Sequence, residues 1–463
     1  MSSPPGCFSW LLRRRQIAGS HPTSHTEAIR PSVGLDDAKV RYVTPCDHSS
    51  ADPSTWWLNT DAPLPPYTLA PGASDTPVID AKIDEISAQL RTLSLDIHDH
   101  PELGFAEVYA HDILTGFMAA HGFKVTKGYL GLATAFRAEF THGQGGRVVG
   151  VNSEYDALKG IGHACGHNLI AVSGCGVAIA IKAALEASGT PGKVVLLGTP
   201  AEEGGGGKII LLEKGGYKDM DLCLMCHPSP GPVKSASLGT STAAQHINVE
   251  YLGQNAHAGA APWEGRNALD AAFLAYGSIS VLRQQMKPDH RVHGIVESNG
   301  EWLPNVIPDR AAMRWIVRAP DAAQLSAFAE RVQNCLQAAA LATSCEIKLT
   351  LEKPYLDLNP NPVLGAEFTD AMMRYGFTTT FGEKGSASTD FGNITYALPA
   401  LHPGYAIPTE PGQGNHTIGF TKAAATQEAH DATMFITKGL AHTGFRALRD
   451  DAFYKEVKAA FKG

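Results

Sequence analysis

The sequence predicts an α/β protein with a mixed β-sheet and a second, smaller domain inserted into the first. The chain has 463 residues, more than one hydrophobic core usually serves, so two domains are expected. Between residues 78 and 242, short apolar strands alternate with helical patterns, which is typical of a mixed or parallel sheet covered on both faces. From residue 243 the order becomes strand-helix-strand-strand-helix-strand, which is that of a ferredoxin-like unit.

The first domain is predicted to begin after a leader, residues 1–77, whose many Pro, Ser and Thr residues indicate a poorly ordered segment. Apolar residues at helical spacing predict helices at Ile79–Ile97 and Glu107–His121. The other elements expected before residue 243 are strands at Ala133–Phe140, Arg147–Asn152, Val194–Leu197, Leu222–Cys226 and Val233–Leu238, and helices at Leu169–Ala187 and Lys208–Lys214.

The inserted domain is predicted to span residues 243–353. Its expected elements are strands at His246–Leu252, Val292–Ser298, Ala311–Arg318 and Glu346–Leu351, and helices at Arg266–Met286 and Ala322–Leu341. Residues 354–463 then return to the first kind of pattern, with helices expected at Val363–Tyr375 and Ala423–Thr443. The first domain is therefore expected in two parts, 78–242 and 354–463.

Composition excludes several classes of protein. The formal net charge of −8 argues against a nucleic-acid partner, which needs a basic face. The eight cysteines lack framework spacing, which favours reduced thiols and a cytoplasmic location. No apolar run reaches the ~18 residues that suggest a membrane span. The cluster Arg13–Arg15 weakly resembles a mitochondrial targeting segment, which is the alternative location.

Two adjacent carboxylates, Glu202 and Glu203, follow the apolar strand Val194–Leu197. Neighbouring side chains point in different directions, so one can hold a metal while the other accepts a proton. A metal is useful here because it lowers the pKa of bound water to ~7. Without other evidence, a solvated glutamate pair at the start of a glycine-rich turn is the commoner interpretation.

A thiol and imidazoles lie at the ends of other apolar segments. Cys165 and His167 precede an apolar helix, at a spacing that places both on one side of a loop, and His227 follows the strand Leu222–Cys226. Cys, His and Glu are zinc ligands, and the alternative is a buried cysteine beside a capping histidine. Cys223–His227 also spells a haem-attachment motif, but two cysteines on one strand would face opposite sides of it.

Polar groups outside these strand ends are candidates for substrate binding. His257 lies in a polar loop of the inserted domain, and Asn305 and Arg318 flank a short turn and strand there. An Arg can bind a carboxylate in a fork, and His or Asn can steady a developing oxyanion. His402 and His416 both lie in loops rich in Gly and Pro, and spacing alone does not choose between them.

Four motifs together resemble the aminoacylase/carboxypeptidase-G family of co-catalytic metallopeptidases, in particular its amidohydrolase branch, which includes hippurate hydrolases, auxin-conjugate hydrolases and cytosolic dipeptidase-like aminoacylases. They occur in the family's order over roughly residues 77–443. The four are Gly162–Asn168, Pro200–Gly204, Asn305–Pro308 and Asn415–Thr417. The resemblance implies a zinc-peptidase-like catalytic domain with two divalent ions, and an inserted domain that acts as a lid and dimerises. Zinc is the expected metal, with manganese or cobalt as alternatives.

The resemblance also implies roles for single residues. Glu202 becomes the general acid/base, and His257 the lid histidine, often supplied by the partner subunit, that polarises the scissile carbonyl. Asn305 and Arg318 match positions that hold the substrate's carbonyl and carboxylate, and His402 only lines the pocket. The implied metal ligands are Cys165, His167, Glu203, His227 and His416.

The chain departs from the peptidase-type pattern at one ligand position. Those members have His-x-Asp where this chain has Glu154-Tyr155-Asp156, so one ligand histidine is absent. Cys165 is expected to compensate, as in the amidohydrolase branch, and Asp156 to support a ligand from behind. Asn168 also stands where many amidohydrolases have Asp.

The predicted function is hydrolysis of the amide bond of N-acyl amino acids or dipeptides by metal-activated water, in a homodimer, with no nucleic-acid or membrane partner. The alternative is a catalytically inactive binding protein on the same fold. The presence of Glu202 together with all five implied ligands argues for the enzyme.

Overall fold

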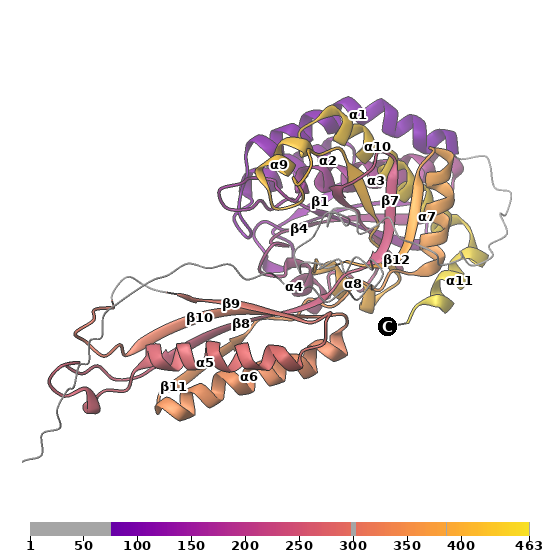
Figure 1. The fold of residues 1–463 in the computed structure, drawn as a ribbon. Helices are drawn as coiled ribbons and strands as arrows, with labels where there is room; N and C mark the ends of the chain where they lie inside the picture. Colours follow the sequence, from indigo (N-terminus) through magenta and orange to yellow (C-terminus); the bar gives the residue numbers. More distant parts are fainter. Residues whose placement is uncertain (1–75, 298–301, 386, 463) are drawn as a thin grey trace, which may run out of the picture. The chain divides into compact units, whose positions relative to one another are not determined.

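The computed structural model describes residues 76–297, 302–385 and 387–462 (Figure 1). The predicted leader, residues 1–77, lies almost wholly outside the described residues. Within them, the catalytic and inserted domains expected from the sequence each have a hydrophobic core of their own. The domain boundaries at residues 242 and 353 stay predictions.

A six-stranded mixed sheet organises the catalytic domain, with the strand order β1-β2-β4-β3-β5-β13. Strands β4, β3, β5 and β13 run parallel to one another, whereas β2 is antiparallel to both β1 and β4. The strands are β1 (Lys124–Lys127), β2 (Phe136–His142), β3 (Arg147–Glu154), β4 (Gly192–Thr199), β5 (Leu222–Leu224) and β13 (Ala400–Leu401).

Helices cover both faces of this sheet, because its strands are apolar on both sides. Along β4, Val194 and Leu196 join the large core beneath one face, while Val195 and Leu197 join a smaller core on the other. The large core contains α1 (Thr76–Asp99), α2 (Val108–Ala120), α3 (His167–Ser188), α7 (Pro362–Arg374), α9 (Ile418–Ala424), α10 (Gln427–Arg449) and α11 (Asp451–Ala460). The smaller core contains α4 (Gly207–Glu213) and α8 (Phe391–Ala397).

A second, four-stranded sheet adjoins the first, with the order β12-β7-β14-β6. Strand β6 continues the chain directly from β5 and pairs with β14 in parallel. The strands are β6 (His227–Pro230), β7 (Ser235–Thr240), β12 (Thr378–Lys384) and β14 (Gly404–Ile407).

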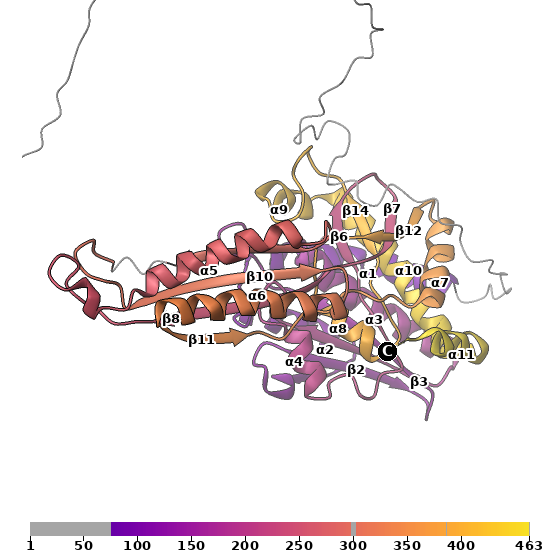
Figure 2. The same ribbon diagram turned by 60° about the horizontal axis from the view of Figure 1, so that its bottom comes forward.

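The inserted domain has the predicted ferredoxin-like order of elements (Figure 2), and its antiparallel sheet has the order β11-β8-β10-β9 (Figure 1). Two helices pack on one face of this sheet, and buried Ala, Leu and Phe residues form the core between them. The elements are β8 (Ala243–Leu252), α5 (Ala268–Leu282), β9 (Arg291–Glu297), β10 (Arg310–Ala319), α6 (Ala322–Thr343) and β11 (Glu346–Leu351), with short 3-10 turns at Pro262–Glu264 and Arg283–Gln285.

Some sequence-based boundaries are wrong. The single helix expected at Ala423–Thr443 is two helices, α9 and α10, because Thr426 leaves the helical conformation and its hydroxyl caps α10. The strand expected at Leu222–Cys226 ends at Leu224, and the one at Val233–Leu238 begins at Ser235. Five short strands are absent from the expected elements, because strands of two to seven residues carry little periodicity. They are β1, β6, β12, β13 and β14.

Helix α3 is the one described helix long and apolar enough to cross a membrane by length and composition. In the protein, 89% of its most apolar stretch is buried. It packs against α1, α10 and β3, as expected of a helix at the centre of a large core.

Candidate metal centre

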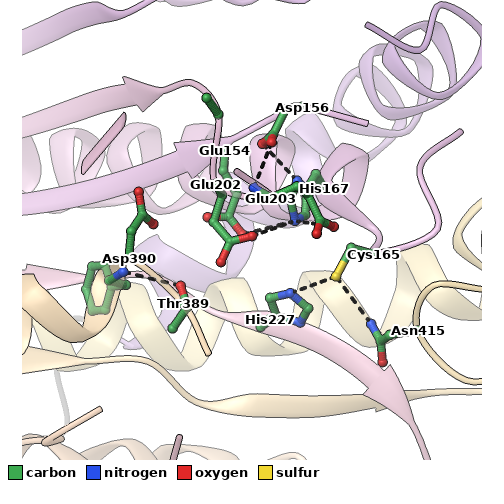
Figure 3. Close-up of polar contacts among 12 residues, drawn as sticks. Glu154, Asp156, Cys165, His167, Glu202, Glu203, His227, Thr389, Asp390 and Asn415 are labelled. Carbon is green, nitrogen blue, oxygen red and sulfur yellow. Dashed lines mark hydrogen bonds and ion pairs between the residues drawn. The ribbon is translucent and has the colours of Figure 1, made fainter. Parts of the chain in front are cut away.

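The residues singled out from the sequence come from successive strand ends. Glu154 is the last residue of β3, and Glu202 and Glu203 lie in the turn after β4. Since β3, β4 and β5 are parallel, their carboxyl ends meet at one edge of the sheet. His227, which begins β6, lies at the same edge beside Cys165 and His167 at the start of α3 (Figure 3).

The five implied metal ligands are brought together as two overlapping groups. Cys165, His167 and His227 form one group, and Cys165, Glu203 and His416 form the other. Within each group the ligand atoms lie within 4.8 Å of one another. The Cys165 Sγ is 3.3 Å from the His227 Nε2, and the His416 Nε2 is 3.3 Å from the Glu203 Oε2. Cys165 therefore stands between two clusters of ligand atoms.

Asp156 contacts one ligand residue of each group. Its Oδ1 is 3.1 Å from the His167 Nδ1, and its Oδ2 accepts a hydrogen bond of 2.9 Å from the Glu203 backbone N–H. An Nδ1–H that donates to a carboxylate leaves the Nε2 lone pair of His167 facing the other ligand atoms. Burial opposes ionisation of Asp156, but the hydrogen bond and charge of His167 outweigh it and lower the pKa of Asp156.

The backbone adopts unusual conformations where the ligands are presented. Gly166, between Cys165 and His167, has φ 75°, and a Cβ there would lie 2.6 Å from the Pro228 Cγ. Ala201 and His416 have φ of 57° and 66°, a region that costs a residue other than glycine roughly 1–2 kcal/mol. Such strain gathers at functional sites, where the surrounding contacts hold it in place.

The turn that carries Glu202 and Glu203 is held from several parts of the chain. The Ala201 N–H donates to the Glu107 carboxylate, 2.8 Å away. The Tyr355 hydroxyl donates to the Glu202 carbonyl and accepts from the Gly206 N–H, both at 2.9 Å. The pair of carboxylates is therefore set in place before any ligand arrives.

Glu202 and Glu203 have different electrostatic surroundings. Burial raises the pKa of Glu202 well above its usual value, and repulsion from Glu154 and Glu203 raises it further. Burial also acts on Glu203, but the hydrogen bond of His416 and the charge of His167 outweigh it and lower the pKa. Glu203 is thus suited to binding a cation as a carboxylate, and Glu202 to carrying a proton.

The donor set fits a divalent metal. The Glu154 Oε1, the His167 Nε2 and the Glu203 Oε1 are buried and have no hydrogen-bond partner among the described residues. An unsatisfied buried polar atom costs about 1–3 kcal/mol, so three in one cluster indicate a missing partner. Thiolate, imidazole and carboxylate are the ligands that zinc takes in proteins.

Sequence reasoning assigned no role to three residues beside this cluster: Glu154, Lys208 and Asp390. The Lys208 Nζ is 2.5 Å from the Glu154 Oε2 and 2.7 Å from the Asp390 Oδ1, and all three side chains are completely buried. Lys208 follows four glycines at the start of an expected helix and Asp390 is the N-cap residue of α8, so the sequence presents each as an ordinary charge at a helix start. The one signal in the sequence was a lysine at the start of an apolar helix, because a lysine in such a place is seldom buried without a charged partner.

The candidate residues of the lid lie at opposite ends of its sheet. Arg318 pairs with Ala244 at one end of the lid sheet, whereas Arg310 pairs with Leu252 at the other. His257 follows the Leu252 end, so ~26 Å of strand separates it from Arg318 at ~3.3 Å per residue. Among the described residues, the side chain of His257 forms hydrogen bonds only with the Gly259 and Ala260 N–H groups.

Asn305 shares the end of the lid that carries His257. The Ala258 N–H donates to the Asn305 carbonyl at 3.0 Å, and the backbone of His257 forms an isolated bridge with Val306. Both side chains are exposed. The two residues expected to polarise the substrate carbonyl therefore lie together, at the end of the lid away from Arg318.

Arg318 contacts the segment before α8, which also carries Asp390. Its Nη1 donates to the Ser388 Oγ at 2.7 Å, two residues before Asp390. No carboxylate pairs with Arg318 among the residues that the structure describes. Burial without a neighbouring anion lowers the pKa of Arg318. A half-buried guanidinium in this state is a suitable site for a substrate carboxylate.

The remaining candidates are part of the packing. His402 is buried and stacks on His227 with ring centroids 6.0 Å apart, and burial lowers its pKa to about 3. Cys223 and Cys226 are buried in the core, where their thiols donate to Asn152 and Ser173.

The fold and the site together are those of a two-domain metallopeptidase. The catalytic domain carries a cluster of zinc-type ligands, and a ferredoxin-like domain is inserted into it. A family model described as Peptidase family M20/M25/M40 matches residues 148–455, more than half of the chain. The chain belongs to this family, and it is a metal-dependent amidohydrolase or dipeptidase.

Its relatives include Xaa-Arg dipeptidases. That of Mus musculus is 41% identical over 396 residues, covering 82% of this chain and 90% of the relative. That of Homo sapiens is 39% identical over 400 residues with the same coverage. The hippurate hydrolase of Campylobacter jejuni is 25% identical over 292 residues and covers 58% of this chain and 74% of the relative.

Solved structures share the fold. A dinuclear metal-binding peptidase of the M20 family from Bacillus subtilis has a TM-score of 0.58 and 21% identity, covering 79% of this chain and 99% of that protein. An aminobenzoyl-glutamate utilization protein from Klebsiella pneumoniae has a TM-score of 0.65 and 17% identity, covering 80% and 99%. These likenesses confirm the fold class predicted from the sequence.

Proposed function

We propose that this chain is a dipeptidase that binds two divalent metal ions, with zinc as the expected metal, and releases a C-terminal basic amino acid. The observation that carries the proposal is the cluster itself, in which two groups of ligand atoms share Cys165 beside a free carboxylate, Glu202. The preference for a basic residue rests on the relatives named Xaa-Arg dipeptidase, of which the chain covers 90%.

One ion would be held by Cys165, His167 and His227, and the other by Cys165, Glu203 and His416. When bound, the ions supply Lewis-acid chemistry: they make water available as a nucleophile and polarise the scissile carbonyl. Asp156 orients His167 and anchors the Glu203 backbone, so it fixes one ligand of each group.

Glu202 is the general base and then the general acid. Its buried carboxylate, which has a raised pKa, takes the proton of the attacking water and returns it to the leaving amine. The Tyr355 hydroxyl and the Glu107 carboxylate keep its turn in place during both transfers. Arg318 would bind the free carboxylate of the dipeptide, because it is half-buried and lacks an anion among the described residues.

A homodimer completes the active site in this proposal. His257 and Asn305 lie at the end of the lid sheet opposite Arg318, so they would serve the metal centre of the partner subunit. Large apolar side chains are exposed on α5 and on the edge strand β9, a surface suited to a second copy. These residues are Phe273, Leu274, Tyr276, Val281 and Ile295. The cytoplasm is the expected location.

The test is hydrolysis by the purified full-length chain reconstituted with Zn²⁺. The substrates are dipeptides with a C-terminal Arg, Lys, Phe or Gly, beside N-acetyl and N-aroyl amino acids, each with and without a chelator. We expect chelator-sensitive release of the C-terminal residue, fastest for Arg and Lys. Turnover of only acyl amino acids would contradict the dipeptidase proposal, and no turnover of any substrate would favour an inactive binding protein.

A further inference from the structure

The buried ion pairs next to the metal centre carry an unbalanced negative charge. Lys208 is one cation between two carboxylates, Glu154 and Asp390, and its Nζ lies within 2.7 Å of both. None of the three side chains is exposed to solvent. Lys208 can neutralise only one of the two carboxylates when both are ionised, so a second cation beside them would stabilise the buried cluster.

One carboxylate oxygen of this cluster has no hydrogen-bond partner among the described residues. Both Asp390 oxygens are satisfied, one by the Lys208 Nζ and the other by the Lys208 backbone N–H at 2.9 Å. The Glu154 Oε2 binds the Lys208 Nζ, but its Oε1 has no hydrogen-bond partner among the described residues. The unsatisfied oxygen therefore belongs to Glu154 alone.

The free oxygen of Glu154 faces the metal centre. It lies 3.4 Å from the His167 Nε2, an atom that also lacks a hydrogen-bond partner among the described residues. With the Glu202 carboxylate these atoms lie within 4.8 Å of one another, as three groups that could hold one ion (Figure 3). The His167 Nδ1 lies 3.1 Å from Asp156; an Nδ1–H donated to that carboxylate would leave the Nε2 lone pair toward the Glu154 oxygen, and a cation between these two atoms would then satisfy both.

We propose that Glu154 is an additional ligand of the metal on the His167 side of the centre, and that Lys208 is the positioning residue that aims it there. This inference rests on the proposed metal centre, in which His167 belongs both to the group with Cys165 and His227 and to the group with Glu154. It also gives a role to the one departure from the peptidase-type motif, since Glu154 stands where those members have a histidine. Carboxylate oxygen is an accepted zinc ligand beside sulfur and nitrogen.

Asp390→Asn is the matched control for Glu154→Gln. Each variant removes one carboxylate from the same buried cluster and leaves Lys208 in a neutral pair with the other. Only Glu154→Gln removes the free oxygen that faces His167. The two variants and the wild-type chain are loaded with Zn²⁺ or Co²⁺, and metal content is measured after dialysis against a competing chelator. The visible absorption of the Co²⁺ form reports the ligands around the ion.

We expect Glu154→Gln to lower the affinity for one of the two ions about ten- to a hundred-fold and to change the Co²⁺ spectrum. Asp390→Asn should keep both the affinity and the spectrum. Equal metal loss in both variants, or no loss in Glu154→Gln, would overturn the assignment. Should Glu154→Gln fail to fold, Glu154→Asp provides the same comparison, because it keeps the charge and withdraws the oxygen.

Lys208 is tested through a double-mutant cycle on the same affinity. Lys208→Met alone should weaken metal binding, and adding it to Glu154→Gln should cause little further loss if it acts by orienting Glu154. Additive losses would show a separate structural role and overturn the positioning assignment. A wild-type chain that binds no metal would instead refute the proposed function, which keeps the two failures distinct.

Discussion

Glu202 and Glu203 are neighbours in sequence and differ in what surrounds them. The Glu203 carboxylate faces His416 and His167, which favour its charged form, whereas Glu202 faces Glu154 and Glu203, which oppose ionisation. A shared turn can therefore supply a ligand and a proton carrier side by side. The division of labour follows from the charges at each position and not from the residue type.

Replacing the proton carrier tests this division. Glu202→Gln keeps the size of the side chain but cannot accept a proton, so we expect kcat to fall by about 10²–10⁴-fold or more. Metal content by elemental analysis should equal that of the wild-type chain. A variant that keeps half the wild-type rate would refute the assignment of Glu202.

The two C-terminal histidines give a second prediction. His416→Ala should lower the metal content, because the His416 Nε2 faces the Glu203 carboxylate in the second ligand group. His402→Ala should keep the metal, since His402 stacks on His227 and lies in neither group. Elemental analysis of both variants decides the choice that sequence spacing left open, and unchanged metal in His416→Ala would remove it from the centre.

Motifs located most of the candidate site because each lies next to a strand end or loop that the sequence marks clearly. Cys165 and His167 lie in a short polar motif before an apolar run, and Glu203 lies in one after an apolar run. The cluster of Glu154, Lys208 and Asp390 could not be found in this way. Lys208 and Asp390 are separated by 182 positions and meet only after the sheet has formed. No local pattern distinguishes such a pair from solvated charges.

At the scale of elements, long helices with a clear apolar period were predicted well. Helix α6 begins at the expected Ala322, and strand β11 has the expected bounds Glu346–Leu351. The C-terminal helices were merged, because alanines run through the junction between α9 and α10 and hide the cap at Thr426. Short strands such as β13 are defined by their partners, which sequence does not reveal.

The cap of α10 has a measurable contribution. The Thr426 Oγ1 accepts from the Ala429 N–H at 3.2 Å, and Thr426→Ala should lower the free energy of unfolding by about 1 kcal/mol. Thr92→Ala, which removes an exposed hydroxyl inside α1, should change it by less than about 0.5 kcal/mol. Urea unfolding of both variants followed by circular dichroism checks the difference, and equal stability would contradict the capping role.

Asp80 on α1 contacts both α10 and the end of α7, and these contacts are sensitive to acid. Burial opposes its ionisation, but contacts with His442 on α10 and the Tyr375 hydroxyl at the end of α7 outweigh burial and lower the pKa. A lowered pKa means that the contribution to stability is present above the unfolded pKa of about 3.9 and is lost as pH falls through the folded value.

Asp80→Asn should therefore be less stable than the wild-type chain at pH 6, and the difference should shrink below about pH 4. Thermal unfolding across pH 6 to 2.5 measures it. A gap that stays constant over this range would show that the ionised form of Asp80 makes no special contribution.

At the scale of the whole molecule, the proposed active site draws on two subunits. The metal ligands and Arg318 belong to one chain, and His257 and Asn305 lie at the opposite end of the lid sheet. Loss of either set alone should inactivate a homodimer. The family resemblance points to all of these residues, whereas only the register of the lid sheet separates His257 and Asn305 from Arg318 of the same chain.

Mixing two inactive variants tests the shared site. Glu202→Gln and His257→Ala homodimers, allowed to exchange subunits, should regain about a quarter of the wild-type activity, because half of the dimers become mixed and each has one intact site. Mixing Glu202→Gln with Glu203→Gln, which damage the same half-site, is the control and should regain nothing. No recovery in the first mixture would indicate that His257 serves its own chain.

The two segments that connect the lid to the catalytic domain are hydrogen-bonded to each other. Ala244 and Tyr355 exchange backbone hydrogen bonds of 2.8 and 2.9 Å, so the polypeptide leaves and re-enters at almost one point. Because its two ends are adjacent, the inserted domain can be replaced by a short linker, or exchanged for that of a homologue, without disturbing the fold of the catalytic domain. The exchanged lid should bring its own preference for the leaving amino acid, whereas metal binding and proton transfer stay with the catalytic domain that receives it.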